Sequence, residues 1–564
     1  MKKIWLSSIL LAFGASAFAQ HLMQVPDTIS GTLFNLNLHK DSVQFKPGAI
    51  TQTFGINGRH YLGPTLIMRK GDSVSITVNN QIGDTTTMHW HGFHVAPAND
   101  GGPYSMIMDG DSWNPKFVVR NRASTYWYHP HMMMKTAEQA IKGDIGFIIV
   151  RDDKEAALNI PRRYGVDDFP IAVQSVELDS QNQFMPKGMV DSIILVNGTD
   201  TPYTNMPAQV VRMRLLNASG ERCFNFGFSG SKHFKIIGND GGLLTAPVDT
   251  DRVWLSPGER AEVLLDLDGM NGQTIYLKSY ASQLPMDVQG GPTMPMPSGP
   301  PMNSPLNGVD FNILQINVGP QTAAPVTTIP TTLVSDTPYT EVTANGHRTI
   351  KMSADSMMVM DGPFYFNDKS FDMDRIDYRI PLNNVEVWTL FDSTMVAHPF
   401  HIHDVHFYIL DRNGVAPTAA ESGPKDVVLV RSMETVRIIA KFEDFADTTI
   451  PYMYHCHILM HEDDGMMGQF KVGPSYTNVS SVTKDNLTLS IYPNPASSQV
   501  NISLQGIGSA KAKVLVFDVL GRQVFSNSFE NKTTIGTAHW PAGVYTAVVQ
   551  QSTTILRKSF VISQ

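Results

Sequence analysis

The chain has 564 residues, of which 42% are hydrophobic and 17% are charged. This length favours several domains, and this composition is typical of a folded protein and excludes a disordered one. The net charge of −9 makes nucleic acid an unexpected partner.

Residues 1–19 have the pattern of a secretory signal peptide. Lys2 and Lys3 form the basic start, an apolar run follows, and Ala17 and Ala19 supply the small residues of a cleavage site. The apolar run is too short to span a bilayer, and no later run is long enough. We therefore expect an exported protein without a transmembrane segment.

A first β domain is expected over residues 27–155, since short alternating strands and turn residues dominate the chain and predict an all-β fold. It carries two pairs of histidines, His89/His91 and His129/His131. Side chains alternate faces along a strand. Each pair therefore presents two imidazoles on one side.

A second domain is expected over residues 165–320. It contains a single histidine, His233, and no group with metal-ligand spacing. We interpret it as structural, a spacer that holds its neighbours in register. Residues 284–307, rich in Pro, Gly and Met, are expected to form a loop or a flexible lid.

The third domain, expected over residues 331–473, holds the segment on which the interpretation rests. Residues 452–457 predict a short strand, so His455 and His457 face one way and Cys456 faces the other. Upstream, His401 and His403 share a face, whereas His398 lies an odd number of positions away. The same alternation thus separates two sites in both segments.

Other residues can complete a metal site on the face toward which Cys456 points. His461 follows five positions later and Met466 ten positions later, and His398 can supply a second imidazole. Two imidazoles, one thiolate and a weak axial thioether suit a blue copper electron-transfer centre. The other cysteine, Cys223, is expected to pack as a small buried apolar residue.

The competing interpretation is that these histidines are hydrogen-bonded core residues or a chance cluster. Ten of the 18 histidines fall in the four compact motifs just described. One His-x-His motif is weak evidence, but four, one of them built round a cysteine, favour metal. His94 and His406 break the alternation, and we expect both to be ordinary hydrogen-bonding residues.

The C-terminal part differs in character from the rest. Residues 474–486 are polar and linker-like, and residues 487–564 alternate short apolar segments with Gly and Pro. This pattern predicts a small β-sandwich. This part contains three short motifs, which are Tyr-Pro-Asn-Pro from Tyr492, Asp-x-x-Gly-Arg from Asp518 and Pro-Ala-Gly-Val-Tyr from Pro541.

Residues 27–473 resemble the three-domain multicopper oxidases, the group of laccases, cuprous oxidases and bilirubin oxidases. The resemblance is carried by the motifs His-Trp-His-Gly, His-Pro-His, His-Pro-Phe-His-Ile-His and His-Cys-His-x3-His-x4-Met. It implies three cupredoxin-like Greek-key β-sandwich domains and four copper ions. It places type 1 copper on His398, Cys456, His461 and Met466, type 2 copper on His89 and His401, and the two type 3 coppers on His91, His129 and His457 and on His131, His403 and His455.

The resemblance also implies roles for two acids and a reaction. Asp100 and Glu462 resemble the family's acids that pass protons toward the oxygen site, the alternative being a turn aspartate and a surface glutamate. Single electrons from a reductant would reach O2 through Cys456, His455 and His457 and yield water. The tail resembles the sorting domain of type IX secretion, which implies the secretion machinery as a partner and a secreted or outer-surface location.

The sequence does not determine which molecule or ion donates the electrons. The 29 methionines favour a metal ion such as Cu(I), and Asp392 and Met395 lie near His398, though not in the register of cuprous oxidases. A laccase-type oxidase of phenols or aromatic amines is the alternative enzyme. A non-catalytic copper-binding or scaffold protein is the alternative from another class.

Overall fold

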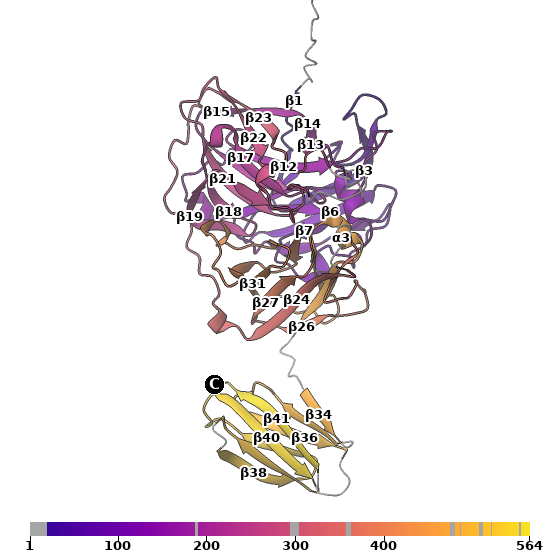
Figure 1. Cartoon of the computed structure of the whole chain (residues 1–564), viewed down its shortest axis with the longest axis vertical. Coiled ribbons are helices and arrows are strands. Elements are labelled where there is room, and N and C mark those ends of the chain that lie inside the picture. The colour runs from indigo at the N-terminus through magenta and orange to yellow at the C-terminus, as the bar shows by residue number, and fades with distance from the viewer. Residues whose placement is uncertain are drawn as a thin grey trace, which may run out of the picture. The chain divides into compact units, whose positions relative to one another are not determined.

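Strands make up 49% of the residues that the structure describes and helices 6%, which confirms the all-β prediction (Figure 1). The computed structural model describes residues 20–186, 190–293, 304–356, 362–473, 480–484, 487–506, 511–519, 522–551 and 554–563. The expected signal peptide and most of the expected linker lie outside these residues, as do residues 294–303 of the expected lid. The chain divides into two compact units, one ending at Gly473 and one beginning at Pro474.

The first sandwich of the N-terminal unit pairs two sheets over one core. One sheet has the order β2(Thr28–Ser30), β5(Thr65–Arg69), β11(Gly146–Arg151), β10(Ser124–His129), β7(His89–His91). The other has the order β4(Thr51–Ile56), β3(Leu33–Val43), β6(Ser73–Gln81), β8(Ser112–Trp113), with β9(Lys116–Val118) also on β6. Leu36 and Ile76 from one sheet meet Leu66 and Ile148 from the other, so alternate residues of each strand are buried.

The second sandwich is built in the same way. Its six-stranded sheet has the order β1(His21–Leu22), β15(Pro202–Pro207), β23(Phe311–Gly319), β22(Thr274–Ser279), β17(Phe224–Phe228), β20(Val253–Leu255). Its seven-stranded sheet has the order β14(Thr199–Asp200), β13(Ile193–Val196), β12(Asp168–Val176), β16(Val210–Asn217), β21(Arg260–Asp266), β18(Phe234–Asn239), β19(Gly242–Thr250). Phe224 and Ile316 pack against Ile171 and Val263 in its core.

The third sandwich carries the cysteine. One sheet has the order β25(Phe364–Phe366), β24(Gly346–Ala354), β27(Asn384–Asp392), β31(Thr435–Phe442), β29(Phe407–Arg412). The other has the order β26(Tyr378–Pro381), β33(Met467–Gly473), β32(Tyr452–Cys456), β28(His398–Ile402), β30(Val427–Val430). The expected strand at 452–457 is thus present and ends one residue earlier, at Cys456.

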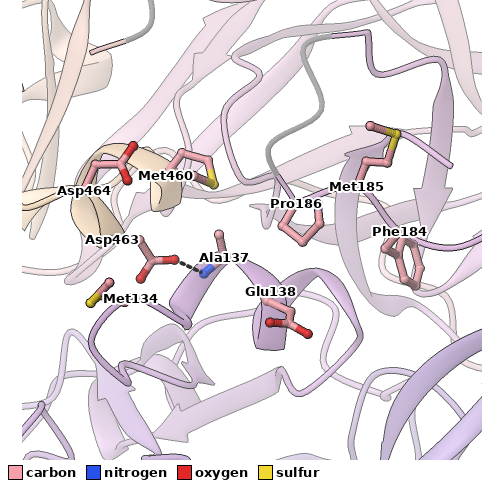
Figure 2. Close-up of a pocket in the computed structure, with 9 residues that line it drawn as sticks. All are labelled: Met134, Ala137, Glu138, Phe184, Met185, Pro186, Met460, Asp463 and Asp464. Atoms are coloured by element: carbon pink, nitrogen blue, oxygen red, sulfur yellow. Dashed lines mark hydrogen bonds between the residues drawn. The ribbon is translucent and has the colours of Figure 1, made fainter. Parts of the chain in front are cut away.

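Two short helices, α1(Thr136–Ile141) of the first sandwich and α3(Leu459–Asp463) of the third, contact one another (Figure 2) beside the histidines. A third helix, α2(Asp153–Ala156), follows β11 and contacts the second sandwich through the ion pair of Glu155 with Arg212. The Asp463 carboxylate accepts hydrogen bonds from the backbone N–H groups of Thr136 and Ala137, both at 2.9 Å, so it satisfies two free donors at the start of α1. Among the described residues, no helix has the length and apolar character needed to cross a membrane.

The C-terminal unit is a separate sandwich with its own core. Its sheets have the orders β34(Ser480–Lys484), β35(Leu487–Tyr492), β36(Gln499–Gln505), β39(Lys532–Gly536) and β38(Gln523–Phe529), β37(Ala512–Phe517), β40(Gly543–Gln551), β41(Thr554–Ile562). Leu489 and Ile502 from one sheet meet Val514 and Phe560 from the other. The small C-terminal β-sandwich expected from the sequence is therefore present.

Candidate metal centre

Two neighbouring antiparallel strands, β28 and β32, direct side chains that can bind metal toward two separate sites. Phe400 pairs with Cys456 and His401 pairs with His455. Directly opposite residues of paired strands point to the same face, and consecutive residues point to opposite faces. The two imidazoles therefore lie on one side of this sheet and the thiol on the other.

The thiol side forms a compact group of three donors. The Cys456 sulfur lies 3.7 Å from Nδ1 of His398 and 3.6 Å from Nδ1 of His461. All three donor atoms lie within 4.8 Å of one another. This is the sulfur and two-imidazole set expected from the sequence.

The surroundings of Cys456 fit a bound metal ion. Met466 is fully buried in the same core, and its carbonyl accepts the backbone N–H of Cys456 at 3.0 Å. Burial raises the pKa of the Cys456 thiol well above its usual value. A buried thiol ionises when it binds a metal ion, and the backbone N–H of Ile458, 3.4 Å from the sulfur, is placed to stabilise the thiolate.

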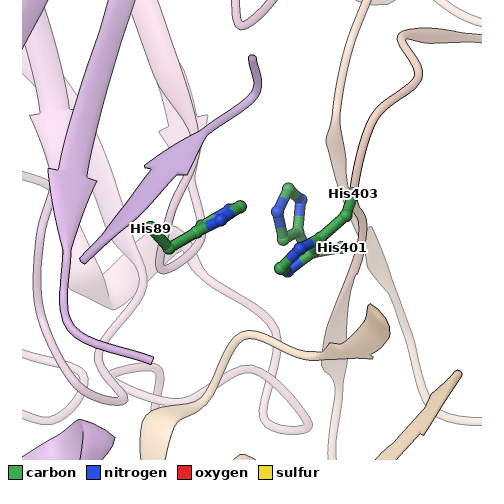
Figure 3. A group of neighbouring side chains, drawn as sticks. All are labelled: His89, His401 and His403. Carbon is green, nitrogen blue, oxygen red and sulfur yellow. The ribbon is translucent and has the colours of Figure 1, made fainter. Parts of the chain in front are cut away.

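On the other side of the sheet, eight histidines from the first and third sandwiches converge. Figure 3 shows the ring of His89, from β7, facing those of His401 and His403, from the other sandwich. All eight are fully or almost fully buried: His89, His91, His129, His131, His401, His403, His455 and His457. The two His-x-His pairs of the first sandwich thus meet the two pairs of the third.

Three of these rings direct their Nε2 atoms at a common point. His131 Nε2 lies 3.2 Å from Nε2 of both His403 and His455, and those two lie 3.4 Å apart. The outer nitrogens of His403 and His455 face acceptors, namely the Asp100 carboxylate at 2.7 Å and the Cys456 carbonyl at 2.9 Å. Their inner nitrogens therefore carry lone pairs, which repel one another unless a cation lies between them.

A second group of three rings meets at Nδ1 of His91. His91 Nδ1 lies 3.2 Å from Nε2 of His129 and 3.3 Å from Nε2 of His457. The outer nitrogen of His129 lies 2.8 Å from the Pro130 carbonyl. In the first group of three rings, nitrogens at these separations could all reach one ion at about 2 Å, the usual length of a metal–imidazole bond.

The remaining pair has orphaned ring nitrogens. Nδ1 of His89 lies 2.8 Å from the Asp100 carbonyl, and Nδ1 of His401 lies 2.7 Å from the Asp426 carbonyl. Nε2 of each ring is buried without a hydrogen-bond partner. Buried polar atoms are rarely left unpaired, so these two nitrogens fit a shared metal ion.

Burial favours the neutral form of several of these imidazoles. It lowers the pKa of His129 to about 4 and that of His461 to about 3. It also lowers the pKa of His89, His91 and His398 well below the usual value. Only the neutral imidazole binds a metal ion, so the donors are ready for copper at neutral pH.

The two expected acids contact the outer nitrogens of these rings. Asp100 accepts from Nδ1 of His403, and its other carboxylate oxygen is buried without a hydrogen-bond partner, 3.5 Å from Nδ1 of His89. Glu462 has its two oxygens 3.2 Å from Nδ1 of His131 and 3.1 Å from Nδ1 of His455. Both acids are buried, which excludes the alternative that Glu462 is a surface residue.

Two further residues at these sites were missed by the sequence analysis. The Thr394 hydroxyl lies 3.0 Å from Nε2 of His398, and an Asp426 oxygen lies 3.1 Å from Nε2 of His91. Asp426 is held in turn by Arg260. In the sequence, only the position of Thr394 shortly before His398 could have indicated its role. No sequence feature indicated the role of Asp426.

Other residues named from the sequence lie outside the two clusters. His94 contacts Asp404 and Asp444, and His406 lies 2.9 Å from the Gly92 carbonyl. Cys223 is buried among apolar side chains. Asp392 is buried and accepts the backbone N–H of Thr394 at 2.8 Å.

Family models for multicopper oxidases match three successive parts of the chain, residues 37–155, 170–293 and 336–476. A model for a secretion system C-terminal sorting domain matches residues 490–563. Each of the three oxidase matches covers most of one sandwich, and the fourth match lies in the C-terminal unit.

Individual proteins agree with these matches. The chain is 32% identical to the multicopper oxidase mco of Staphylococcus aureus over 78% of this chain and 88% of that one. It is 30% identical to the cell division protein FtsP of Escherichia coli over 83% and 97%.

Solved structures agree as well. A laccase from Pediococcus acidilactici has a TM-score of 0.70 at 32% identity, with 81% of this chain and 94% of that one covered. A multicopper oxidase from Campylobacter jejuni, described as a metallo-oxidase, has a TM-score of 0.66 at 26% identity over 81% and 95%. With its sulfur and histidine clusters and these matches along most of its length, the chain belongs to the multicopper oxidase family.

Proposed function

We propose that this oxidase takes single electrons from a small reductant and reduces O2 to water with four copper ions. Bound copper would supply the electron transfer and the O2 chemistry, and the protein supplies the ligands, their orientation and the protons. Type 1 copper would be held by His398, Cys456, His461 and Met466. The other three would be held by His89 and His401, by His91, His129 and His457, and by His131, His403 and His455.

The observation that carries the proposal is the pairing of β28 with β32. It places the Cys456 sulfur in one cluster while its sequence neighbours His455 and His457 enter the other. The electron path between the clusters is therefore a few covalent bonds of one strand. A protein that only stored copper would have no need of this connection.

Asp100 and Glu462 are proposed to supply protons. Reduction of one O2 to two waters consumes four protons in a place closed to solvent. Each acid contacts an outer nitrogen of a histidine in the eight-histidine cluster. Asp100 also keeps one carboxylate oxygen without a hydrogen-bond partner, so it can accept and release a proton there.

The reductant is proposed to be Cu(I) or a similar metal ion. Several methionines are exposed, among them Met106, Met108 and Met134, and thioethers suit monovalent copper. The similarity to a metallo-oxidase of Campylobacter jejuni supports this proposal. The similarity to the Pediococcus laccase supports the alternative, a phenol or aromatic amine.

A non-catalytic scaffold on the same fold remains the alternative from another class, and the likeness to a cell division protein favours it. Oxygen uptake by the copper-loaded protein decides among the metal-ion oxidase, the oxidase of phenols or aromatic amines, and the scaffold. The panel is Cu(I), Fe(II), Mn(II), a phenol and bilirubin. Uptake with none of these, despite four bound coppers, would refute the oxidase.

The C-terminal unit is proposed to direct the protein to the type IX secretion machinery. Its match to a secretion sorting domain supports this role. The oxidase would then act outside the cell or on its outer surface.

A further inference from the structure

The guanidinium group of Arg260, the first residue of β21 in the second sandwich, is buried and uses all of its N–H groups. Its Nε donates to the Thr125 carbonyl at 3.1 Å, and its terminal nitrogens donate to the carbonyls of Gly258 and Asp240, both at 3.0 Å. The other two bonds hold the carboxylate of Asp426, at 2.5 and 2.6 Å. An arginine has five N–H donors, so this side chain is fully engaged by the protein.

Two of these partners belong to the sandwiches that carry the histidines. Thr125 lies in β10 of the first sandwich, the strand that ends at His129. Asp426 directly precedes β30 of the third sandwich, and its carbonyl lies 2.7 Å from Nδ1 of His401. Arg260 thus connects the second sandwich to the supports of two cluster histidines, one from each of the other sandwiches.

The backbone around this arginine also packs closely against the cluster. Gly258 has a φ of +86°, and a Cβ atom there would lie 2.8 Å from the ring of His457. Gly92, the residue after His91, has a φ of +81°, and a Cβ atom there would overlap an oxygen of Asp426. Both positions therefore require glycine, and the carboxylate lies directly against the backbone beside a cluster histidine.

The orientation of His91 gives this carboxylate its importance. Nδ1 of His91 faces the other rings, 3.2 Å from Nε2 of His129 and 3.3 Å from Nε2 of His457. A metal ion on that side needs the lone pair of Nδ1, so the ring proton must be on Nε2. An Asp426 oxygen lies 3.1 Å from this Nε2 and can accept its proton in a hydrogen bond. Such a bond fixes the tautomer and the orientation of a metal-binding imidazole.

Arg260 determines which role Asp426 takes. An oxygen of Asp426 lies within 4.8 Å of ring nitrogens of His91 and His401, so this carboxylate could itself be a metal ligand. Both of its oxygens, however, already accept bonds from a guanidinium that is always charged. The two parallel bonds neutralise the carboxylate and fix its plane. Asp426 is therefore placed to accept the proton of His91 and not to bind the ion.

We propose that Arg260 is a positioning residue of the eight-histidine cluster, which acts through Asp426 to hold His91 with its Nδ1 directed at a copper ion. The second sandwich, interpreted from the sequence as a spacer, then takes part in building the cluster. The proposal rests on the proposed copper sites and adds a residue on which their geometry depends. Arg260 acts on the ligands and not on the bound ions.

The test is an oxygen-free titration of the copper-free full chain with Cu(I) against a competing chelator. Arg260→Lys keeps the positive charge but loses the planar fork that holds both oxygens of Asp426. We expect the affinity of the cluster for its most weakly bound ion to fall by roughly 10- to 100-fold, the usual effect of removing an outer partner of a metal ligand. The visible absorption of the thiolate centre after loading with Cu(II) should stay the same.

Arg212→Lys is the matched control. Arg212 is as deeply buried as Arg260, lies in the same sandwich, and donates its hydrogen bonds to Glu155 and Glu262, which are not among the proposed copper ligands. Each variant weakens a buried ion pair, so urea unfolding of both copper-free proteins should show a loss of stability. Only Arg260→Lys should lose copper affinity.

A second variant, Arg260→Met/Asp426→Leu, replaces the whole ion pair by apolar side chains. Proteins often tolerate such a replacement of a buried pair, whereas removal of one partner leaves a buried charge uncompensated. The double variant therefore keeps the test decisive should Arg260→Lys fail to fold. Because it also removes the acceptor of the His91 proton, its copper affinity should fall by a similar factor.

Three results would overturn the inference. The first is wild-type copper affinity in either Arg260 variant. The second is an equal loss of copper affinity in Arg212→Lys, which would assign the effect to general destabilisation. The third is tighter binding or an additional ion in Arg260→Lys, because a released Asp426 carboxylate would then be a metal ligand. A wild type that binds four ions without oxygen uptake would refute the oxidase function, and the titration would still judge Arg260.

Discussion

His455 and Cys456 are consecutive residues of β32, yet their side chains belong to different clusters. Nε2 of His455 lies 3.2 Å from Nε2 of His131, and the sulfur of Cys456 lies 3.7 Å from Nδ1 of His398. The alternation of side chains along an extended strand produces this separation. It would allow one strand to connect the proposed copper–thiolate centre to the eight-histidine cluster on the opposite face.

Replacing the sulfur should disconnect the two clusters without unfolding the protein. We expect Cys456→Ser to lose the intense visible absorption of a copper–thiolate centre and to lose oxygen uptake with every reductant. Bound copper should fall from four ions to three, because the eight histidines are untouched. Absorption spectra, metal analysis and oxygen uptake check these outcomes.

Cys223→Ser is the matched control. Cys223 is buried among Leu284, Val288 and Ala397, outside both clusters. This substitution should lower the free energy of unfolding by about 1–3 kcal/mol, since it buries a hydroxyl, and should leave the visible band intact. Loss of the band in Cys223→Ser would contradict the assignment of Cys456 as the copper ligand.

The division of the ligands between two faces could be predicted because it depends only on the parity of positions along a strand. The approach of His89 and His91 to His401 and His457 depends on how two sandwiches pack, which local patterns do not encode. Family resemblance supplied that part. Thr394 and Asp426 could not be found, because their roles arise from a turn and a neighbouring strand that bring a hydroxyl and a carboxylate to the outer nitrogens of the ligands.

Thr394 should tune the copper–thiolate centre through His398. Nε2 of His398 and the Thr394 hydroxyl lie 3.0 Å apart, and the hydroxyl also lies 2.9 Å from the Val396 carbonyl. Thr394→Val removes this partner at nearly constant volume. We expect copper affinity at this centre to fall by roughly 10- to 100-fold, with a shifted visible band and potential. Thr394→Ser keeps the hydroxyl and should behave as the wild type, and equal effects of the two variants would argue against the hydrogen bond.

Glu462 should act after electron entry. Burial raises the pKa of Glu462. His455, His129 and Thr136 lower it by more, so the pKa of Glu462 lies below its usual value. Glu462→Gln keeps the shape and loses the proton-carrying group. We expect kcat to fall by about 10²-fold or more, while the rate of anaerobic reduction of the copper–thiolate centre stays the same. A slower anaerobic reduction would assign Glu462 to electron entry instead.

His94 should make stability depend on pH. Burial lowers its pKa, but Asp404 and Asp444 more than offset burial and raise the pKa to about 9. The pKa in the unfolded chain is about 6.5, so the contribution is fully present below pH 6.5 and is lost as pH rises through 9. A tenfold change in a protonation equilibrium corresponds to about 1.4 kcal/mol, so this shift contributes roughly 3 kcal/mol.

Urea unfolding of the copper-free protein at pH 6, 7.5 and 9 measures this contribution. The free energy of unfolding should decline over this range, and His94→Gln should flatten the decline. His233→Gln is the control, because His233 is exposed and pairs only with Asp249 among the carboxylates of the described residues. An identical decline in all three proteins would exclude His94 as its source.

Deleting residues 474–564 should separate export from oxidation. The core of the C-terminal unit contains only residues from 487 onward, such as Leu489 and Phe560. The residues proposed to bind copper all lie before Gly473. Because each unit buries its own apolar core, the shortened protein should keep its copper content, its visible absorption and its oxygen uptake. Scanning calorimetry should show the transition of the oxidase unit unchanged and that of the tail missing. In cells, the shortened protein should remain behind the outer membrane, and its normal appearance outside the cell would refute the proposed sorting role of the tail.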